Sequence, residues 1–161
     1  DYFIFDREVR AAGDGVVAAM ENGFPDRSAA NPQENFIERL AGLTPVFLRQ
    51  GVSLQNIRSG NYIVLDHLNG EFSYYCHLRE NIPVKPGEKV KKGQVIARVG
   101  NSGNSSEPHL HFQLMDGKDF ATANGLPVVF EDINLTTALD SPFFGDRNCL
   151  LYSEFIFTFT N

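Results

Sequence analysis

Short runs of apolar residues, several of them alternating with polar ones, extend along most of the chain, and turn-forming residues separate them. The clearest runs are 62–65 and 72–78, which flank Asn69-Gly70, a dipeptide that favours a tight β-hairpin turn. Similar runs predict strands at 94–99, 109–115, 125–130 and 155–160, and a further hairpin over 9–20 around Asp14-Gly15. The pattern therefore predicts a mostly β protein.

One segment has a helical pattern instead. Asn31-Pro32-Gln33-Glu34 combines a capping residue, a proline in the first turn and a glutamate at the third helical position. Phe36, Ile37 and Leu40 then fall on one helical face, and Gly42 is a suitable end. We expect a short helix here, inserted between strands.

Composition and charge restrict the classes of function. Hydrophobic residues make up 42% of the 161 residues, which is enough for a packed core in one domain. No apolar run reaches the ~18 residues that a membrane-spanning helix needs. The net charge of −6 argues against binding to the phosphate backbone of nucleic acids. The lysines of 84–92 are interrupted by glycine and proline, so we expect a solvated turn there.

A histidine pair is the first candidate for chemistry. In His109-Leu110-His111, the two-residue period of a strand places both imidazoles on one face, roughly 6–7 Å apart. Such a pair could bind a metal ion together, or one ring could bind the metal while the other transfers protons. Two surface histidines on a half-exposed strand would give the same pattern, so the pair alone is a weak signal.

Two further histidines are placed by the hairpin. In the 72–78 strand, alternation puts His77 on the face opposite to the apolar row that includes Cys76. His77 could therefore face one groove together with His109 and His111, whereas Cys76 is expected to be a buried apolar residue. For His67, at the end of the preceding strand, a structural role is the favoured interpretation.

Four segments, in this order, form a recognisable signature. They are DGVV at 14–17, GNYIVLDH followed by GEFSYYCHL within 60–78, VKPGEKVKKGQVI at 84–96, and GNSGNSSEPHLHF at 100–112. Together they resemble the lysostaphin-like zinc metallo-endopeptidases, over about residues 9–20 and 60–115. Residues 21–59 lie outside this pattern as an insertion, and residues 116–161 as a C-terminal extension.

The resemblance implies a fold and an activity. The fold would be a small antiparallel β-sandwich or barrel-like core, a duplicated hybrid motif with an open groove, in a single domain over 1–161. The activity would be zinc-dependent hydrolysis of peptide bonds in bacterial peptidoglycan. The implied partners are peptidoglycan peptides, without nucleic acid and without a membrane span. The implied location is extracytoplasmic: periplasmic, secreted or in the cell envelope.

The resemblance also assigns roles to the histidines. His111 corresponds to a zinc ligand, His109 to the catalytic general base, and His77 to its catalytic partner near the developing oxyanion. The chemistry agrees, because zinc lowers the pKa of a bound water from ~15.7 towards ~7 and a neutral imidazole can accept the proton of that water. A second imidazole can donate a hydrogen bond to the oxyanion.

One family motif has no counterpart in the chain. The family carries a histidine followed four residues later by an aspartate, upstream of the Asp-Gly segment, and no histidine precedes His67 here. Asp1 is a weaker candidate for the aspartate. His111 alone would give zinc one protein ligand, whereas catalytic zinc sites have three. We therefore expect the first two ligands to lie upstream of residue 1.

Two other functions compete with the endopeptidase. A non-catalytic relative could bind the cell wall, or activate another hydrolase, through the same groove, and its zinc content would distinguish it. Residues 84–95 are also similar to the hairpin of biotinyl and lipoyl carrier domains. Those domains display a lysine that is usually flanked by methionines, and Met20 and Met115 flank no lysine, which argues against a carrier.

Overall fold

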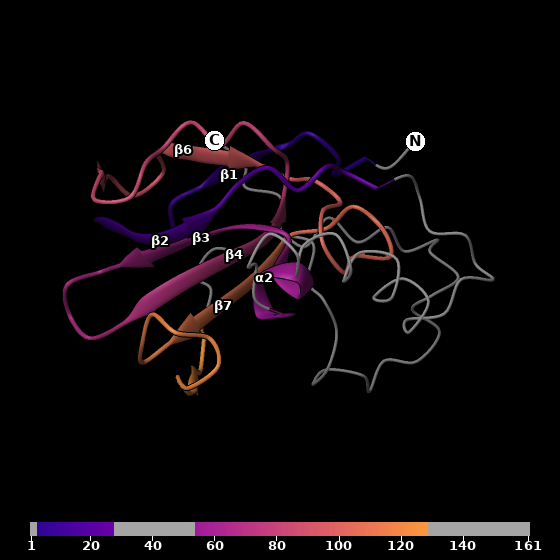
Figure 1. The fold of residues 1–161 in the computed structure, drawn as a ribbon. Helices are drawn as coiled ribbons and strands as arrows, with labels where there is room; N and C mark the ends of the chain where they lie inside the picture. Colours follow the sequence, from indigo (N-terminus) through magenta and orange to yellow (C-terminus); the bar gives the residue numbers. More distant parts are fainter. Residues whose placement is uncertain (1–2, 28–53, 129–161) are drawn as a thin grey trace, which may run out of the picture. The chain divides into compact units, whose positions relative to one another are not determined.

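The computed structural model describes residues 3–27 and 54–128, and those up to Pro127 belong to one compact unit (Figure 1). Within these residues the elements are β1 (Glu8–Arg10), β2 (Gly15–Glu21), α2 (Leu54–Ser59), β3 (Asn61–Asp66), β4 (Phe72–Leu78), β5 (Lys89–Val90), β6 (Val95–Arg98), β7 (His111–Met115) and β8 (Gly125–Leu126). The predicted mostly β architecture is confirmed.

The strands form two open antiparallel sheets. The larger sheet has the order β5-β2-β3-β4-β7-β8, and the smaller one consists of β1 and β6. Figure 1 shows β1 and β6 above one face of the larger sheet. The hairpin of β3 and β4 around Asn69-Gly70 is confirmed, with Leu65 opposite Ser73. The antiparallel two-layer core expected from the sequence is thus present.

The main core lies between the two sheets. Val9 and Ala97 from the smaller sheet pack with Leu65, Tyr75 and Leu78 from the larger one, and all five are buried. Burial of a large apolar side chain contributes about 1.5–3 kcal/mol each, so this layer holds the two sheets together.

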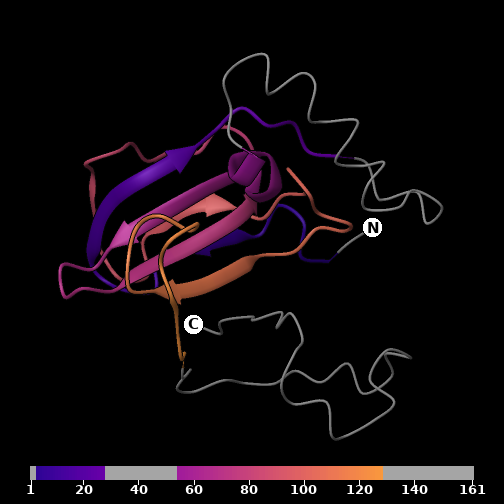
Figure 2. The same ribbon diagram turned by 60° about the horizontal axis from the view of Figure 1, so that its bottom comes forward.

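A second apolar cluster covers the opposite face of the larger sheet. Val64, Tyr74, Cys76 and Met115 are buried there, and Phe120 packs against them. The central strand β4 is therefore buried on both faces. Figure 2 shows α2 at the end of the large sheet where β3 begins.

The hairpin predicted for 9–20 is wrong. β1 pairs with β6, whereas β2 pairs with β3 and β5, so the two runs belong to different sheets. After β1, the backbone of Ala11 still exchanges hydrogen bonds with Gly93 and Gln94, and the chain then crosses to the larger sheet, where β2 begins. Asp14 does not close a hairpin: its carboxylate accepts hydrogen bonds from the Lys92 amide (2.9 Å) and from Lys91 Nζ (2.7 Å).

The other predicted elements have mixed outcomes. The strand at 94–99 is confirmed as β6. The strand at 109–115 begins two residues late, as β7. Of the strand at 125–130, β8 covers the first two residues, residues 127 and 128 are not in a strand, and the last two lie outside the described residues. The helix at 31–42 and the strand at 155–160 lie outside the described residues. The six-residue helix α2 was not predicted. The limits of the insertion and of the C-terminal extension stay predictions.

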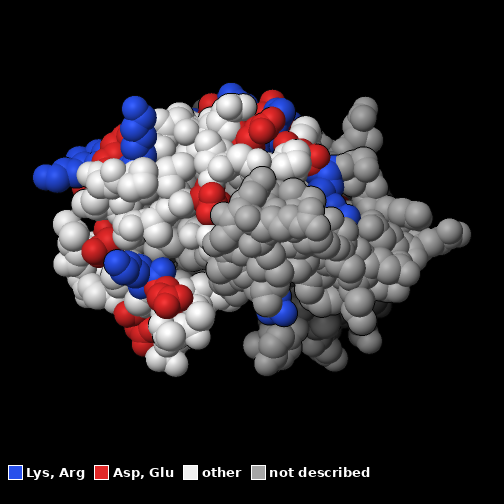
Figure 3. All heavy atoms as spheres, viewed as in Figure 1, with Lys and Arg blue, Asp and Glu red and all other residues white. Residues whose placement is uncertain are grey.

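The lysines of the segment 84–92 are solvated, as expected, whereas its two valines are buried. Lys85, Lys89, Lys91 and Lys92 are all exposed, and Lys91 is paired with Asp14. On the face that Figure 3 shows, basic and acidic side chains of the described residues are interspersed. No helix within 3–27 and 54–128 is long and apolar enough to cross a membrane.

Candidate active site

His77 lies in a β-bulge near the end of β4. Asn61 pairs with Leu78 but Ile63 pairs with Tyr75, so two steps along β3 match three steps along β4. Such a bulge redirects side chains and is common beside active sites. His77 has a φ of 59°, a backbone conformation that costs a residue other than glycine of order 1–3 kcal/mol.

The bulge changes the faces expected for β4. Leu78 packs into the core between the sheets together with Tyr75, so strict alternation ends before it. The ring centroid of His77 lies 4.7 Å from that of His109 and 6.0 Å from that of His111. Because His111 pairs directly with Cys76, His77 turns towards the face of Cys76. The prediction that His77 and Cys76 lie on opposite faces is therefore wrong.

The three rings of His77, His109 and His111 form what we call the histidine cluster. Its membership agrees with the grouping expected from the sequence. Cys76 beside it is buried, and burial raises the pKa of its thiol, so it remains an uncharged core residue as predicted. Leu110 and Phe112, between and after the histidines of 109–111, pack against the core between the sheets.

The environment of His77 keeps its imidazole neutral. The side chain is 6% exposed, and burial, followed by the proximity of His109, lowers the pKa of His77 to about 3. Its Nδ1 lies 3.0 Å from the carbonyl oxygen of Ser102. A carbonyl can only accept, so the ring proton is on Nδ1 and Nε2 carries the lone pair.

His109 is held in the same way by the loop that precedes β7. Its Nδ1 donates to the carbonyl oxygen of Glu107 at 2.8 Å and lies 3.1 Å from Ser105 Oγ. Ser105 in turn donates to the same carbonyl at 2.7 Å. The neutral ring therefore has its proton on Nδ1 and its lone pair on Nε2.

His111 has the opposite tautomer. Its Nε2 donates to Gln113 Oε1 at 3.1 Å, so the lone pair is on Nδ1. Gln113 lies two residues further along β7, on the same face as His111. Each ring of the histidine cluster therefore has one N–H bound to an oxygen and one basic nitrogen, and a metal-binding histidine normally has this arrangement.

The cluster does not by itself form a complete metal site. Among the residues that the structure describes, no three His, Cys, Asp or Glu side chains come together in a way that could hold a metal ion. The donors present are imidazole nitrogens, a ligand type that suits zinc, but a catalytic zinc needs three protein ligands. The weaker candidate Asp1 lies outside the described residues.

Comparison with known proteins identifies the family. The model of peptidase family M23 matches residues 4–124, most of the chain. The chain belongs to the M23 peptidase family. The resemblance inferred from the four segments is thereby confirmed, and membership places the chain in a family of hydrolases.

Relatives of this M23 chain include cell-wall enzymes. ShyA of Vibrio cholerae, a peptidoglycan DD-endopeptidase, is 38% identical over 84 residues, 52% of this chain and 18% of ShyA. Mpg of Neisseria meningitidis, a DD-carboxypeptidase/endopeptidase, is 30% identical over 114 residues, 71% of this chain and 21% of Mpg. The chain thus spans about a fifth of the length of these curated relatives.

Solved M23 structures resemble the chain as well. The catalytic domain of the antimicrobial peptidase lysostaphin from Staphylococcus simulans has 25% sequence identity and a TM-score of 0.49. The match covers 77% of this chain and 70% of that domain.

His67 lies apart from the histidine cluster in this M23 chain. Its Nδ1 donates to the carbonyl oxygen of Asp14 at 2.8 Å, and its Nε2 lies 2.8 Å from the buried Ser73 Oγ. A Cβ on Gly13 would lie 3.0 Å from the ring, so the crossover from β1 packs closely against it. Both ring nitrogens are used locally, which supports the structural role expected for His67.

Replacing His67 should therefore affect stability and not chemistry. We expect His67→Ala to lower the free energy of unfolding by about 1–3 kcal/mol, because the buried hydroxyl of Ser73 loses a partner. Urea denaturation measures this change. Under conditions in which the variant is folded, its rate of hydrolysis should equal that of the wild type. Loss of hydrolysis in a variant as stable as the wild type would place His67 in the active site.

Sequence reasoning missed the residues that orient the three rings. Two of the orienting groups are the backbone carbonyls of Ser102 and Glu107. Every residue has such a carbonyl, so the sequence does not indicate which ones contact the rings. Gln113 could have been found, because it lies on the same strand face as His111 at a spacing of two. The bulge at His77 had no signal, since neither glycine nor proline marks it.

Proposed function

We propose that the chain is the catalytic part of a zinc-dependent endopeptidase that hydrolyses peptide bonds in bacterial peptidoglycan outside the cytoplasm. Membership of the M23 peptidases supports peptide hydrolysis. The names of ShyA and Mpg support peptidoglycan as the substrate and, with it, an extracytoplasmic location. The observation that carries the proposal is the histidine cluster, whose three rings each keep one basic nitrogen.

His111 is the residue that we propose as a zinc ligand, through Nδ1. Gln113 fits this role, because an acceptor on the second ring nitrogen orients a metal-binding histidine and makes it more basic. When bound, zinc acidifies a water molecule and polarises the scissile carbonyl. The other protein ligands would come from residues that the structure does not describe, or from elsewhere in the protein that carries this chain.

His109 is proposed as the general base. Its unprotonated Nε2 can accept a proton from the attacking water, which places a positive charge on the ring. The carbonyl of Glu107, 2.8 Å from Nδ1, then faces the N–H of an imidazolium, and such a charge-assisted hydrogen bond is stronger than the neutral one. The loop before β7 therefore stabilises the protonated form of His109, which forms when this residue acts as a base.

His77 is proposed as the second catalytic residue. Its ring lies against His109, and it is neutral with its proton on Nδ1. In this state Nε2 can accept a hydrogen bond, and it can donate one to an oxyanion only after it has gained a proton. The geometry thus supports a role in which the unprotonated Nε2 of His77 accepts a hydrogen bond from the attacking water and so orients it.

Zinc binding is tested on the protein that carries this chain, purified without chelators. We expect about one zinc ion per chain by elemental analysis, and release of soluble peptidoglycan fragments that stops when zinc is chelated and resumes when it is restored. His111→Ala should lose the metal and the activity together. His67→Ala is the matched control, and it should keep both.

Two results would contradict the proposal. Hydrolysis that persists after complete zinc removal would exclude the metal mechanism. Folded protein that contains no zinc, releases no fragments and yet binds insoluble peptidoglycan would instead support the non-catalytic, cell-wall-binding or hydrolase-activating function.

A further inference from the structure

The loop of residues 100–103 contacts His77 at two points. The Gly100 amide donates to the backbone carbonyl of His77 at 3.0 Å. The His77 ring donates from Nδ1 to the carbonyl of Ser102, also at 3.0 Å. The backbone and the ring of His77 are therefore fixed by the same short loop, so the position of this loop determines the direction of the ring.

The side chain of Ser102 attaches this loop to the large sheet. Its Oγ accepts a hydrogen bond from the backbone amide of Asn61 at 3.0 Å and donates one to the backbone carbonyl of Leu78 at 2.7 Å. Ser102 has no exposed surface, so no water can replace either contact without a rearrangement. The serine thus links the first residue of β3 to the residue that follows His77.

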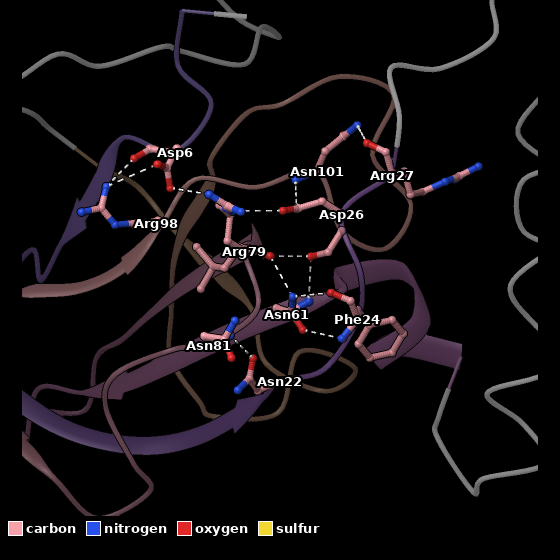
Figure 4. A network of polar contacts seen from close by, with 12 residues as sticks. Asp6, Asn22, Phe24, Asp26, Arg27, Asn61, Arg79, Asn81, Arg98 and Asn101 are labelled. Atoms are coloured by element: carbon pink, nitrogen blue, oxygen red, sulfur yellow. Dashed lines mark hydrogen bonds and ion pairs between the residues drawn. The ribbon is translucent and has the colours of Figure 1, made fainter.

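Asn61 reinforces the same junction (Figure 4). Its Nδ2 donates to the carbonyl of Leu78 at 2.9 Å and to that of Phe24 at 2.7 Å, and its Oδ1 accepts from the Phe24 amide at 2.8 Å. The Leu78 carbonyl therefore receives hydrogen bonds from both Asn61 and Ser102. Every polar atom of the Asn61 side chain is engaged, and the side chain is fully buried.

We propose that Asn61 and Ser102 together position the His77 ring, and we call this pair the latch. The latch holds the backbone carbonyl of Ser102 beside Nδ1 of His77, where only a ring that carries its proton on Nδ1 can donate a hydrogen bond to it. The two are positioning residues, since they act through His77 and not on a substrate. A neutral imidazole has two tautomers, and an acceptor fixed at Nδ1 selects the one with its lone pair on Nε2. The latch thus sets which nitrogen His77 presents to His109 and His111. Its importance for catalysis rests on the proposed function.

The test uses Ser102→Ala in the protein that carries this chain. In the wild type we expect nitrogen NMR of the His77 ring to show a single tautomer, protonated at Nδ1. In S102A the carbonyl is no longer held, and we expect a second tautomer, or averaged ring signals, for His77. We also expect kcat to fall about tenfold to 100-fold, with KM within a few-fold of the wild type, because a small misplacement of a catalytic group mainly affects the chemical step.

Ser73→Ala is the matched control. Like Ser102, Ser73 is a buried serine whose hydroxyl makes two hydrogen bonds. It lies in β4 and contacts the side chains of His67 and Tyr75 instead of the groups that hold His77. S73A should lose stability while the His77 ring signals stay as in the wild type. If S102A does not fold, Ser102→Cys, which is similar in size and a weaker donor, is measured in the same way.

The outcomes separate the latch from the enzyme function. Wild-type ring signals for His77 in folded S102A or S102C would overturn the latch, whether or not the protein hydrolyses peptidoglycan. A shifted tautomer in a protein that lacks zinc and hydrolytic activity would support the latch and contradict the proposed function. Equal changes in S73A and S102A would show a general loss of stability, and would also overturn the latch.

Discussion

Replacement of His109 by alanine is expected to lower kcat for peptidoglycan hydrolysis about 10²–10⁴-fold, the usual contribution of a general base. The ring nitrogen that would accept the proton is Nε2, because Nδ1 is bound to the carbonyl of Glu107. The fold should be retained, since His109 precedes β7 and is only partly buried. Zinc should also be retained, because the proposed ligand is His111.

The measurement compares three variants under one assay that follows soluble fragments released from purified peptidoglycan. His109→Ala should keep its zinc and lose its hydrolytic activity. His111→Ala should lose both the zinc and the activity, and His67→Ala should keep both. This pattern assigns a separate role to each histidine. Wild-type activity in H109A would remove the general-base role, and loss of zinc in H109A would make this residue a ligand instead.

The regular parts of the fold could be predicted from the sequence, because their signals are local. The hairpin of β3 and β4 follows from Asn69-Gly70 between two apolar runs. Strand periodicity predicted the grouping of His109 with His111, although β7 begins only at His111. The pairing of β1 with β6 could not be predicted in this way, since it joins residues 85 to 90 positions apart, and Asp14-Gly15 gave a false hairpin signal.

The orientation of the site depends on features with no local signal. Periodicity placed His77 opposite Cys76, and the bulge reversed this. The bulge is stabilised by distant contacts, with Asn61 opposite Leu78 and the 100–103 loop bound to His77 itself. The strained backbone at His77 is therefore maintained by its surroundings, as strained backbone in folded proteins generally is. The resemblance assigns a catalytic role to His77, and the structure shows how its ring is held.

The second large effect is expected for the glycines that let the 100–103 loop approach β3. Gly103 has a φ of 69°, and a Cβ there would lie 2.6 Å from the Cα of Gly60 and 2.8 Å from the carbonyl oxygen of Arg58. All of these neighbours are backbone atoms, which cannot move aside as a flexible side chain can. Gly103→Ala should therefore lower the free energy of unfolding by about 3 kcal/mol or more, through the left-handed backbone and the overlap together.

Gly70→Ala separates the two causes. Gly70 also has a positive φ, 89°, but no atom lies within 4 Å of the position of its Cβ. This variant should lose only the conformational part, about 1–2 kcal/mol. Urea denaturation of both variants measures the difference. A loss in G103A no larger than in G70A would mean that the loop can move away from Gly60 at little cost. A loop that moves so easily could not hold the Ser102 carbonyl against His77, so the close approach of Gly60 and Gly103 is packing that the proposed latch requires.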